Sequence, residues 1–202
     1  QKYISEEKTH SDGFVQPYLD SPADNELVAR NVYINILNDA TDYVYITTPY
    51  LILDPELTNS IVSASKRGVN IKIITPHIPD KWYVDAVTKS NYDVLIKSGV
   101  KIYEYRYGFI HAKSVISDDE SAIIGTANFD YRSFYYLFEN FVFLYKPNSI
   151  KEIKSDFVKT MYESIEISEK DIENRSFFKK SYYSFMKFFS IFMWFYIFNI
   201  FF

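Results

Sequence analysis

The chain of 202 residues contains no cysteine, so disulfide bonds and thiolate metal sites are excluded and the redox compartment stays open. It also lacks an excess of positive charge, because 26 acidic residues against 22 basic ones give a formal net charge of −4. Nucleic-acid-binding proteins are more often basic, so an anionic ligand would have to be held by a local positive pocket. No side chains cluster at zinc spacing, and the sequence implies neither a metal nor another cofactor.

A signal-like stretch is also missing from the start of the chain, and the first residue is Gln1, which indicates a piece of something longer. Residues 1–24 are polar and rich in turn formers, so we expect a linker there. The remaining composition is that of a globular protein with one sizeable α/β domain. We therefore divide the chain into a linker (1–24), a catalytic domain (25–165) and a hydrophobic tail (166–202).

Apolar residues recur with helical and strand periodicity in alternation through most of the domain. Helices are expected at 24–39, 54–67, 80–99 and 148–164, with Asp54 and Asp80 as N-caps. Strands are expected at 43–48, 70–75, 100–103, 112–117, 121–125 and 139–145. Short connections between alternating strands and helices favour parallel pairing. The sequence therefore predicts an α/β fold with a mixed, largely parallel β-sheet flanked by helices.

The tail is strongly apolar at its end, where residues 188–202 are interrupted only by Ser190 and Asn199. That run is shorter than the roughly 20 residues that span a bilayer. Lysines 179, 180 and 187 ahead of an aromatic run suit an interfacial membrane anchor, or a marginal span. The alternative is a hydrophobic helix that docks on a partner domain missing from this chain.

The chemistry of the chain centres on His111 and Lys113. Residues two apart on a strand point to the same side, so the imidazole and the ammonium are expected to face one pocket while Ala112 faces away. A neutral imidazole can attack phosphorus, since its ordinary pKa of roughly 6.5 leaves much of it uncharged near pH 7. The ammonium can neutralise the non-bridging phosphate oxygens in the transition state.

Four further residues complete the expected site. Thr126 and Asn128 follow a strand and a glycine, where they could donate hydrogen bonds to the same oxygens. Glu139 starts the next strand, and its carboxylate could accept the other ring N–H of the histidine and fix the tautomer. Asp118 ends the motif strand and suits hydrogen bonds within the hairpin better than contact with substrate. His77 follows a strand and either lines the same cleft or is structural.

The spacing from His111 through Lys113 to Asp118 resembles the HxKxxxxD signature of the phospholipase D superfamily. More of the chain, about residues 13–165, resembles the second half of bacterial cardiolipin synthases. The segments that carry this resemblance are 15–26, 45–51, 66–69, 74–81, 99–111 and 125–133. A chance match to the short motif alone would not extend through these segments.

The resemblance implies a phospholipase D-like fold and transfer of a phosphatidyl group between two phosphatidylglycerols, giving cardiolipin and glycerol through a phosphatidyl-histidine. It implies His111, Lys113 and Asp118 as the catalytic set, supported by Glu139, with Lys113, Thr126 and Asn128 holding the phosphate. The implied partners are an anionic phospholipid membrane and a second phospholipase D-like half. The implied location is the cytoplasmic face of a bacterial cell membrane.

The sequence departs from that family in one respect, and this departure leads to competing hypotheses about its function. The family's chemistry uses two histidines, and this sequence has no second His-x-Lys, since His10 and His77 are followed by other residues. The second histidine would come from a separate first half or from a second copy of the chain. The competing hypotheses are a homodimeric phosphodiesterase or nuclease, which the acidic composition disfavours, and a catalytically silent interaction domain.

Overall fold

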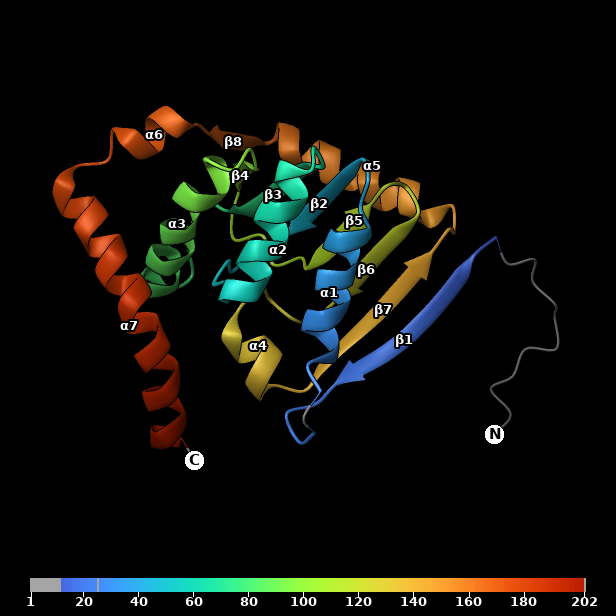
Figure 1. Cartoon of the computed structure of the whole chain (residues 1–202), viewed down its shortest axis with the longest axis horizontal. Coiled ribbons are helices and arrows are strands. Elements are labelled where there is room, and N and C mark those ends of the chain that lie inside the picture. The colour runs from blue at the N-terminus through green and yellow to red at the C-terminus, as the bar shows by residue number, and fades with distance from the viewer. Residues whose placement is uncertain (1–11, 25, 202) are drawn as a thin grey trace.

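A computed structural model describes residues 12–24 and 26–201, with the side chains of those residues up to residue 190. Strands and helices alternate along most of the chain (Figure 1). The strands are β1 (Phe14–Asp20), β2 (Tyr43–Thr47), β3 (Asn70–Pro76), β4 (Lys101–Tyr105), β5 (Ser114–Ser117), β6 (Ser121–Gly125), β7 (Glu139–Tyr145) and β8 (Ser164–Ile167). The helices are α1 (Val28–Asp39), α2 (Pro55–Lys66), α3 (Trp82–Ile96), α4 (Tyr131–Tyr136), α5 (Ser149–Tyr162), α6 (Glu169–Glu173) and α7 (Phe177–Phe201).

Over the described residues the strands form one sheet of eight, in the order β1-β7-β6-β5-β2-β3-β4-β8. Strands β2, β3 and β4 are parallel neighbours, whereas the other pairings among the described strands are antiparallel. The α/β class and the mixed sheet are confirmed, but the expectation of a largely parallel sheet is wrong. One reason for the antiparallel pairings is the short turn of residues 118–120, which joins β5 to β6. A turn of this length cannot make the long crossover that parallel strands need.

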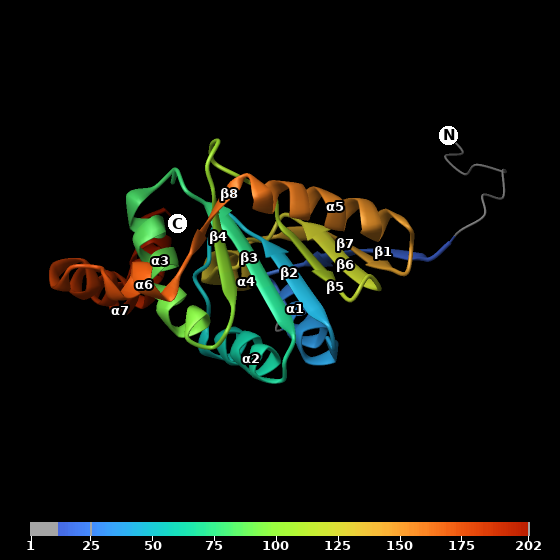
Figure 2. The same cartoon turned by 90° about the horizontal axis from the view of Figure 1, so that it is seen from above.

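Helices cover both faces of the sheet, as the view from above shows (Figure 2). Residues of β2 alternate between the faces, since Val44 and Ile46 pack toward α1 and α2, while Tyr43 and Tyr45 pack toward α5. This period of two is the one that sheet geometry requires of a strand buried on both sides. This part of the fold therefore has three layers, with the sheet in the middle.

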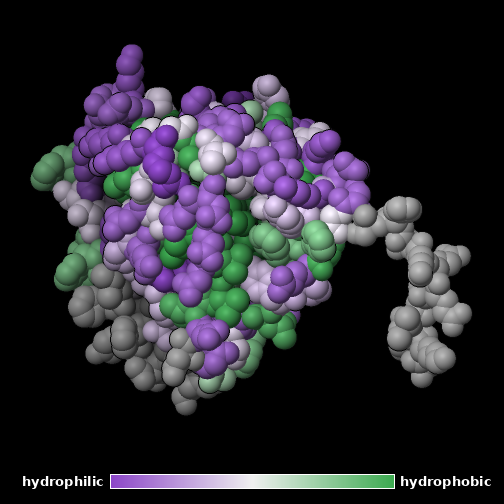
Figure 3. Space-filling model, turned by 45° about the vertical axis from the view of Figure 1, so that its right-hand side comes forward, coloured by the Kyte–Doolittle hydropathy of each residue, from purple (hydrophilic) through white to green (hydrophobic). Residues whose placement is uncertain are grey.

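The expected linker contains a strand. β1 pairs antiparallel with β7 along its whole length, from Phe14 opposite Tyr145 to Asp20 opposite Glu139. A proline within β1 is tolerated because an edge strand has one side without ladder hydrogen bonds. Figure 3 turns this side of the molecule forward and shows hydrophobic surface between hydrophilic flanks. Residues 1–11, including His10, lie outside the described residues.

One of the two expected helix caps is confirmed. The Asp54 carboxylate accepts a hydrogen bond from the Leu57 N–H at 2.8 Å, and the helix starts at Pro55. The expectation that Asp80 caps the next helix is wrong, because α3 starts one residue later, after Lys81, and has no side-chain cap. The Asp80 carboxylate instead accepts a hydrogen bond from the Tyr50 hydroxyl.

The expected tail starts inside the sheet, because β8 pairs with the edge of β4. Beyond it, α7 packs against α3 through a narrow stripe that includes Tyr183 and Met186. Most other described side chains of α7 are exposed, among them several aromatic ones. In the part of the chain that the structure describes, no helix combines the length and apolarity needed to cross a membrane.

Candidate active site

The candidate site lies at one edge of the sheet, where ends of the strands β2, β5, β6 and β7 meet. The register aligns Thr47 at the end of β2 with Ser114 at the start of β5, and Ser114 with Ile124 near the end of β6. Gly125, the last residue of β6, lies opposite Phe141 near the start of β7. The parallel strands β2 to β4 also end here, and open α/β sheets bind ligands outside the carboxyl ends of their strands.

A cavity of about 810 Å³ opens at this edge. Among the side chains that line it are five of the six expected site residues, His111, Lys113, Thr126, Asn128 and Glu139. Glu152 and Asp156 of α5 also line the cavity, and nothing in the sequence pointed to them. Residues far apart in the chain thus converge on one volume large enough for a phosphate diester headgroup.

His111 and Lys113 lie in the loop just before β5 and not on the strand, as we had expected. They nevertheless line the same cavity, and Ala112 between them is among its lining residues too. The Lys113 ammonium donates a hydrogen bond to the His111 carbonyl oxygen at 2.7 Å. This bond links the buried lysine to the backbone that carries the exposed imidazole.

The electrostatics of the cavity favour an uncharged imidazole. Partial burial lowers the pKa of His111, the positive charge of Lys113 lowers it further, and the negative charge of Asp80 opposes both effects. Burial also lowers the pKa of Lys113, while the carboxylates of Glu139 and Asp130 raise it. His111 is therefore biased toward the neutral form that can act as a nucleophile near pH 7.

Glu139 is buried at the start of β7, and its carboxylate accepts a hydrogen bond from the Thr126 hydroxyl. The same hydroxyl accepts a hydrogen bond from the Asn140 N–H at 2.9 Å. Among the described residues Glu139 makes no hydrogen bond to His111, so its expected orienting role stays a prediction. In this arrangement Glu139 positions Thr126 and offsets the charge of Lys113.

One polar atom of the Asn128 side chain has no hydrogen-bond partner among the described residues. Its side-chain Nδ2 donates to Asp130 at 3.3 Å, whereas its Oδ1 is buried and has no partner among the described residues. Asp130 is fully buried and caps α4 by accepting from the Ser133 N–H at 2.7 Å. Burial raises the pKa of Asp130, and the charge of Glu139 adds to that. Asp130 was not among the expected site residues, although an Asp three residues before Ser133 is a recognisable helix-start pattern.

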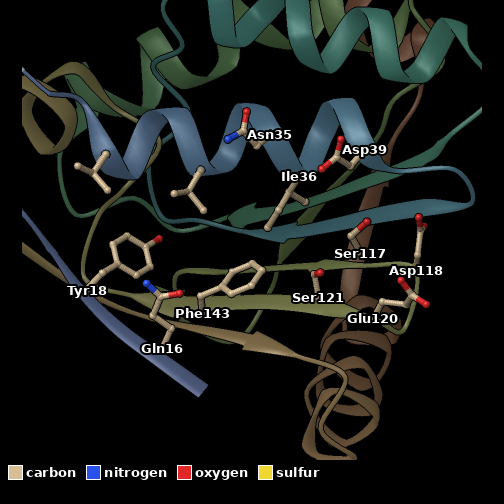
Figure 4. Close-up of a pocket in the computed structure, with 12 residues that line it drawn as sticks. Gln16, Tyr18, Asn35, Ile36, Asp39, Ser117, Asp118, Glu120, Ser121 and Phe143 are labelled. Carbon is tan, nitrogen blue, oxygen red and sulfur yellow. The ribbon is translucent and has the colours of Figure 1, made fainter. Parts of the chain in front are cut away.

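The structure places Asp118 outside this cavity, at the other end of β5. Its carboxylate accepts hydrogen bonds from the N–H groups of Thr41, Asp42 and Tyr43, at 2.8, 3.1 and 2.8 Å. Figure 4 shows it beside Ser117 and Glu120, at one end of a separate cavity of about 370 Å³ below α1. The expectation that Asp118 is catalytic is therefore replaced by a structural role.

His77 is also outside the cavity that His111 lines. Its Nδ1 lies 2.8 Å from a carboxylate oxygen of Glu104, which is buried in β4. His111 is consequently the only histidine that lines the cavity among the described residues.

Solved structures identify the fold as that of the phospholipase D class. The phospholipase D family member Nuc from Salmonella typhimurium superposes with a TM-score of 0.66 at 18% identity, covering 77% of this chain and 99% of Nuc. The phosphatidylserine synthase of Haemophilus influenzae gives a TM-score of 0.68 at 18% identity, covering 89% of this chain and 46% of the synthase.

Within that class, residues 33–161 match the family described as cardiolipin synthase, PLD-like domain, and the chain belongs to that family. A Streptococcus mutans protein is 48% identical over 163 residues, which are 81% of this chain and 35% of that protein. The cardiolipin synthase of Alkalihalophilus pseudofirmus is 34% identical over 182 residues, 89% of this chain and 36% of the synthase. The chain thus spans about a third of the length of these relatives.

Proposed function

We propose that this chain supplies one half of a cardiolipin synthase active site. The reaction transfers a phosphatidyl group from one phosphatidylglycerol to a hydroxyl of another, with release of glycerol. The observation that carries the proposal is the convergence of His111 and Lys113 with Thr126 and Asn128 on a single cavity at the sheet edge. A metal-free phosphoryl transfer needs this combination of a nucleophile, a fixed positive charge and polar donors.

In the first step an imidazole nitrogen of His111 attacks phosphorus, and the bond between phosphorus and the glycerol oxygen breaks. A second histidine protonates that oxygen, so glycerol leaves as a neutral molecule. In the second step the same histidine removes the proton from the hydroxyl of the incoming phosphatidylglycerol. The resulting oxygen attacks phosphorus, the bond to His111 breaks, and cardiolipin is formed.

The positive charge of Lys113 and the Nδ2 amide of Asn128 are suited to the non-bridging phosphate oxygens during both steps. The lowered pKa of His111 supports its assignment as nucleophile, because attack requires the neutral imidazole. Below that pKa the ring is protonated and the rate falls, so the active range extends to lower pH than an ordinary histidine would allow.

The second histidine must come from outside this cavity, since the described residues bring only His111 to it. We propose that it is supplied either by a separate phospholipase D-like half or by a second copy of the chain. The exposed side chains of Phe14, Val15 and Leu19 on the edge strand β1 offer apolar surface to such a partner.

The test of the proposed function is cardiolipin formation from phosphatidylglycerol vesicles, followed by mass spectrometry. The purified chain is assayed alone and after mixing with a separately expressed first half of a related synthase. Product from the chain alone would identify a working homodimer, and product only after mixing would identify a half-site. Folded protein that gives no product under either condition would contradict the proposal.

We also propose that the chain works at a membrane, at the cytoplasmic face of a bacterial cell. Support comes from α7, which exposes Phe178 and Phe185 by 84% and 56%. No acidic residue follows Glu173 in the sequence, whereas four of the 22 basic residues do, so the last part of the chain is positive and the rest has a net charge of −8. A positively charged, aromatic helix suits the interface of an anionic bilayer.

Replacing Phe178 and Phe185 together with serine is expected to weaken binding to phosphatidylglycerol vesicles by at least about tenfold, because two apolar side chains no longer leave water. Co-sedimentation measures the bound fraction. Phe14→Ser is the matched control, since Phe14 is similarly exposed, at 73%, but lies on β1. Equal binding by the double variant and the control would argue against α7 as the contact.

A further inference from the structure

A chain of side-chain contacts leads from the loop between β3 and α3 to the imidazole of His111. The Asp80 carboxylate accepts a hydrogen bond of 2.5 Å from the Tyr50 hydroxyl. The Tyr50 ring lies against Phe109, with centroids 6.1 Å apart, and Phe109 lies against the His111 ring, with centroids 5.5 Å apart. Four side chains from three segments thus form one connected row that ends at the proposed nucleophile.

The row is backed by closely packed residues. Pro49, Pro76 and Pro79 line its inner side, and the space left between them and the aromatic rings amounts to about 10 Å³. So small a space indicates that Phe109 and Tyr50 pack closely against these prolines. Phe109 therefore lies between Tyr50 and the His111 ring, and Tyr50 is in turn held by its hydrogen bond to Asp80.

We propose that Asp80 and Tyr50 are positioning residues for His111, with Asp80 holding Tyr50, Tyr50 supporting Phe109, and Phe109 setting the plane of the imidazole. This inference rests on the proposed function, because it gives a role to groups that do not touch the phosphate. It also explains why Asp80 does not cap α3, since its carboxylate is engaged with Tyr50 at the sheet edge.

Asp80 also acts on the charge of the imidazole. Its negative charge raises the pKa of His111, against the lowering by burial and by Lys113. Glu139 and Asp130 face Lys113 from β7 and from the start of α4, and they raise the pKa of that lysine. The removal of the Asp80 charge is therefore expected to lower the pKa of His111 further and to move the acid limb of the pH–rate profile to lower pH.

Two conservative variants separate the effect of the contacts on the orientation of the His111 ring from the effect of the Asp80 charge on the pKa of His111. Asp80→Asn keeps an oxygen that accepts from Tyr50 but removes the charge, so the pKa of His111 should fall while the contact between the Phe109 and His111 rings is kept. Tyr50→Phe keeps the ring but breaks the link to Asp80, so kcat should fall by about tenfold at unchanged KM, through loss of orientation. Asp93→Asn is the charge control, because Asp93 is an exposed carboxylate further along α3 that pairs with Lys97.

The primary readout needs no turnover. Nuclear magnetic resonance titration of the imidazole protons in the chain itself gives the pKa of His111, with its signal assigned by its loss in His111→Ala. Nuclear Overhauser contacts between the Phe109 and His111 rings report their packing, which Tyr50→Phe should weaken. An unchanged pKa in Asp80→Asn or unchanged ring contacts in Tyr50→Phe would overturn the proposal, whether or not cardiolipin is formed.

Discussion

Replacing His111 with alanine is expected to reduce phosphatidyl transfer by about 10⁴-fold or more in whichever assembly is active, because the proposed mechanism forms the bond to phosphorus at the only imidazole that lines the cavity among the described residues. Lys113 has no attacking lone pair while it is an ammonium, and Glu139 is bonded to Thr126. The rate is measured as cardiolipin formed per mole of folded protein, at saturating phosphatidylglycerol. Folding itself should be unchanged, because the imidazole is exposed and donates no hydrogen bond within the described part of the chain.

The matched control is His77→Gln. His77 is the other histidine at this sheet edge, and a glutamine amide can still donate to the buried carboxylate of Glu104. Its rate should stay within about twofold of the unaltered protein, since His77 does not line the cavity of the candidate site. Retention of more than a tenth of the rate by His111→Ala, or an equal loss in both variants, would refute the assignment of His111.

The residues of the candidate site were largely predictable because their signals are local. A histidine and a lysine two apart, followed by a glycine and two polar residues after the next strand, place four side chains at adjacent strand ends. In the structure all four of these residues line one cavity. The partner of Glu139 was not predictable, because the choice between Thr126 and His111 depends on side-chain geometry at the meeting point of three strands.

The fold was predictable where neighbours in sequence are neighbours in space. Strands β2, β3 and β4 alternate with helices, and their parallel pairing follows from that order. Strand β1 was missed because its partner among the described strands, β7, lies more than a hundred residues later in the chain. Pairing with β7 stabilises β1 as a strand, although its proline and polar residues locally favour a linker. The residues around β1 in the sequence do not reveal this pairing.

Replacing Asp118 with alanine is expected to destabilise the fold by about 3 kcal/mol without changing the chemistry of the cavity. Loss of the carboxylate leaves the N–H groups at the start of β2 without their acceptor, which costs about 2 kcal/mol. Asp118 also has a φ of 55°, a conformation that costs alanine about 1 kcal/mol. Urea unfolding measures the loss as a lower midpoint.

Two further variants divide that loss between its causes. Asp118→Gly removes the same hydrogen bonds but tolerates a positive φ, so it should lose less stability than alanine does. Asp118→Asn tolerates the φ and keeps one accepting oxygen, so it should be the mildest of the three. The reverse order, or equal losses, would show that the backbone bonds to residues 41–43 are not what Asp118 supplies.

The length of β5 explains why Asp118 stabilises the fold and does not contact the phosphate. Lys113 and Asp118 are five residues apart on an extended segment, which at roughly 3.3 Å per residue separates them by about 16 Å. A carboxylate at that distance cannot reach a phosphate held by Lys113, but it can tie the end of β5 to the start of β2. Because β2 and β5 run side by side, this tie fixes the register that brings His111 and Lys113 to the carboxyl end of β2. If Asp118→Asn instead kept full stability and lost turnover per folded molecule, the residue would have to act in the chemistry after all.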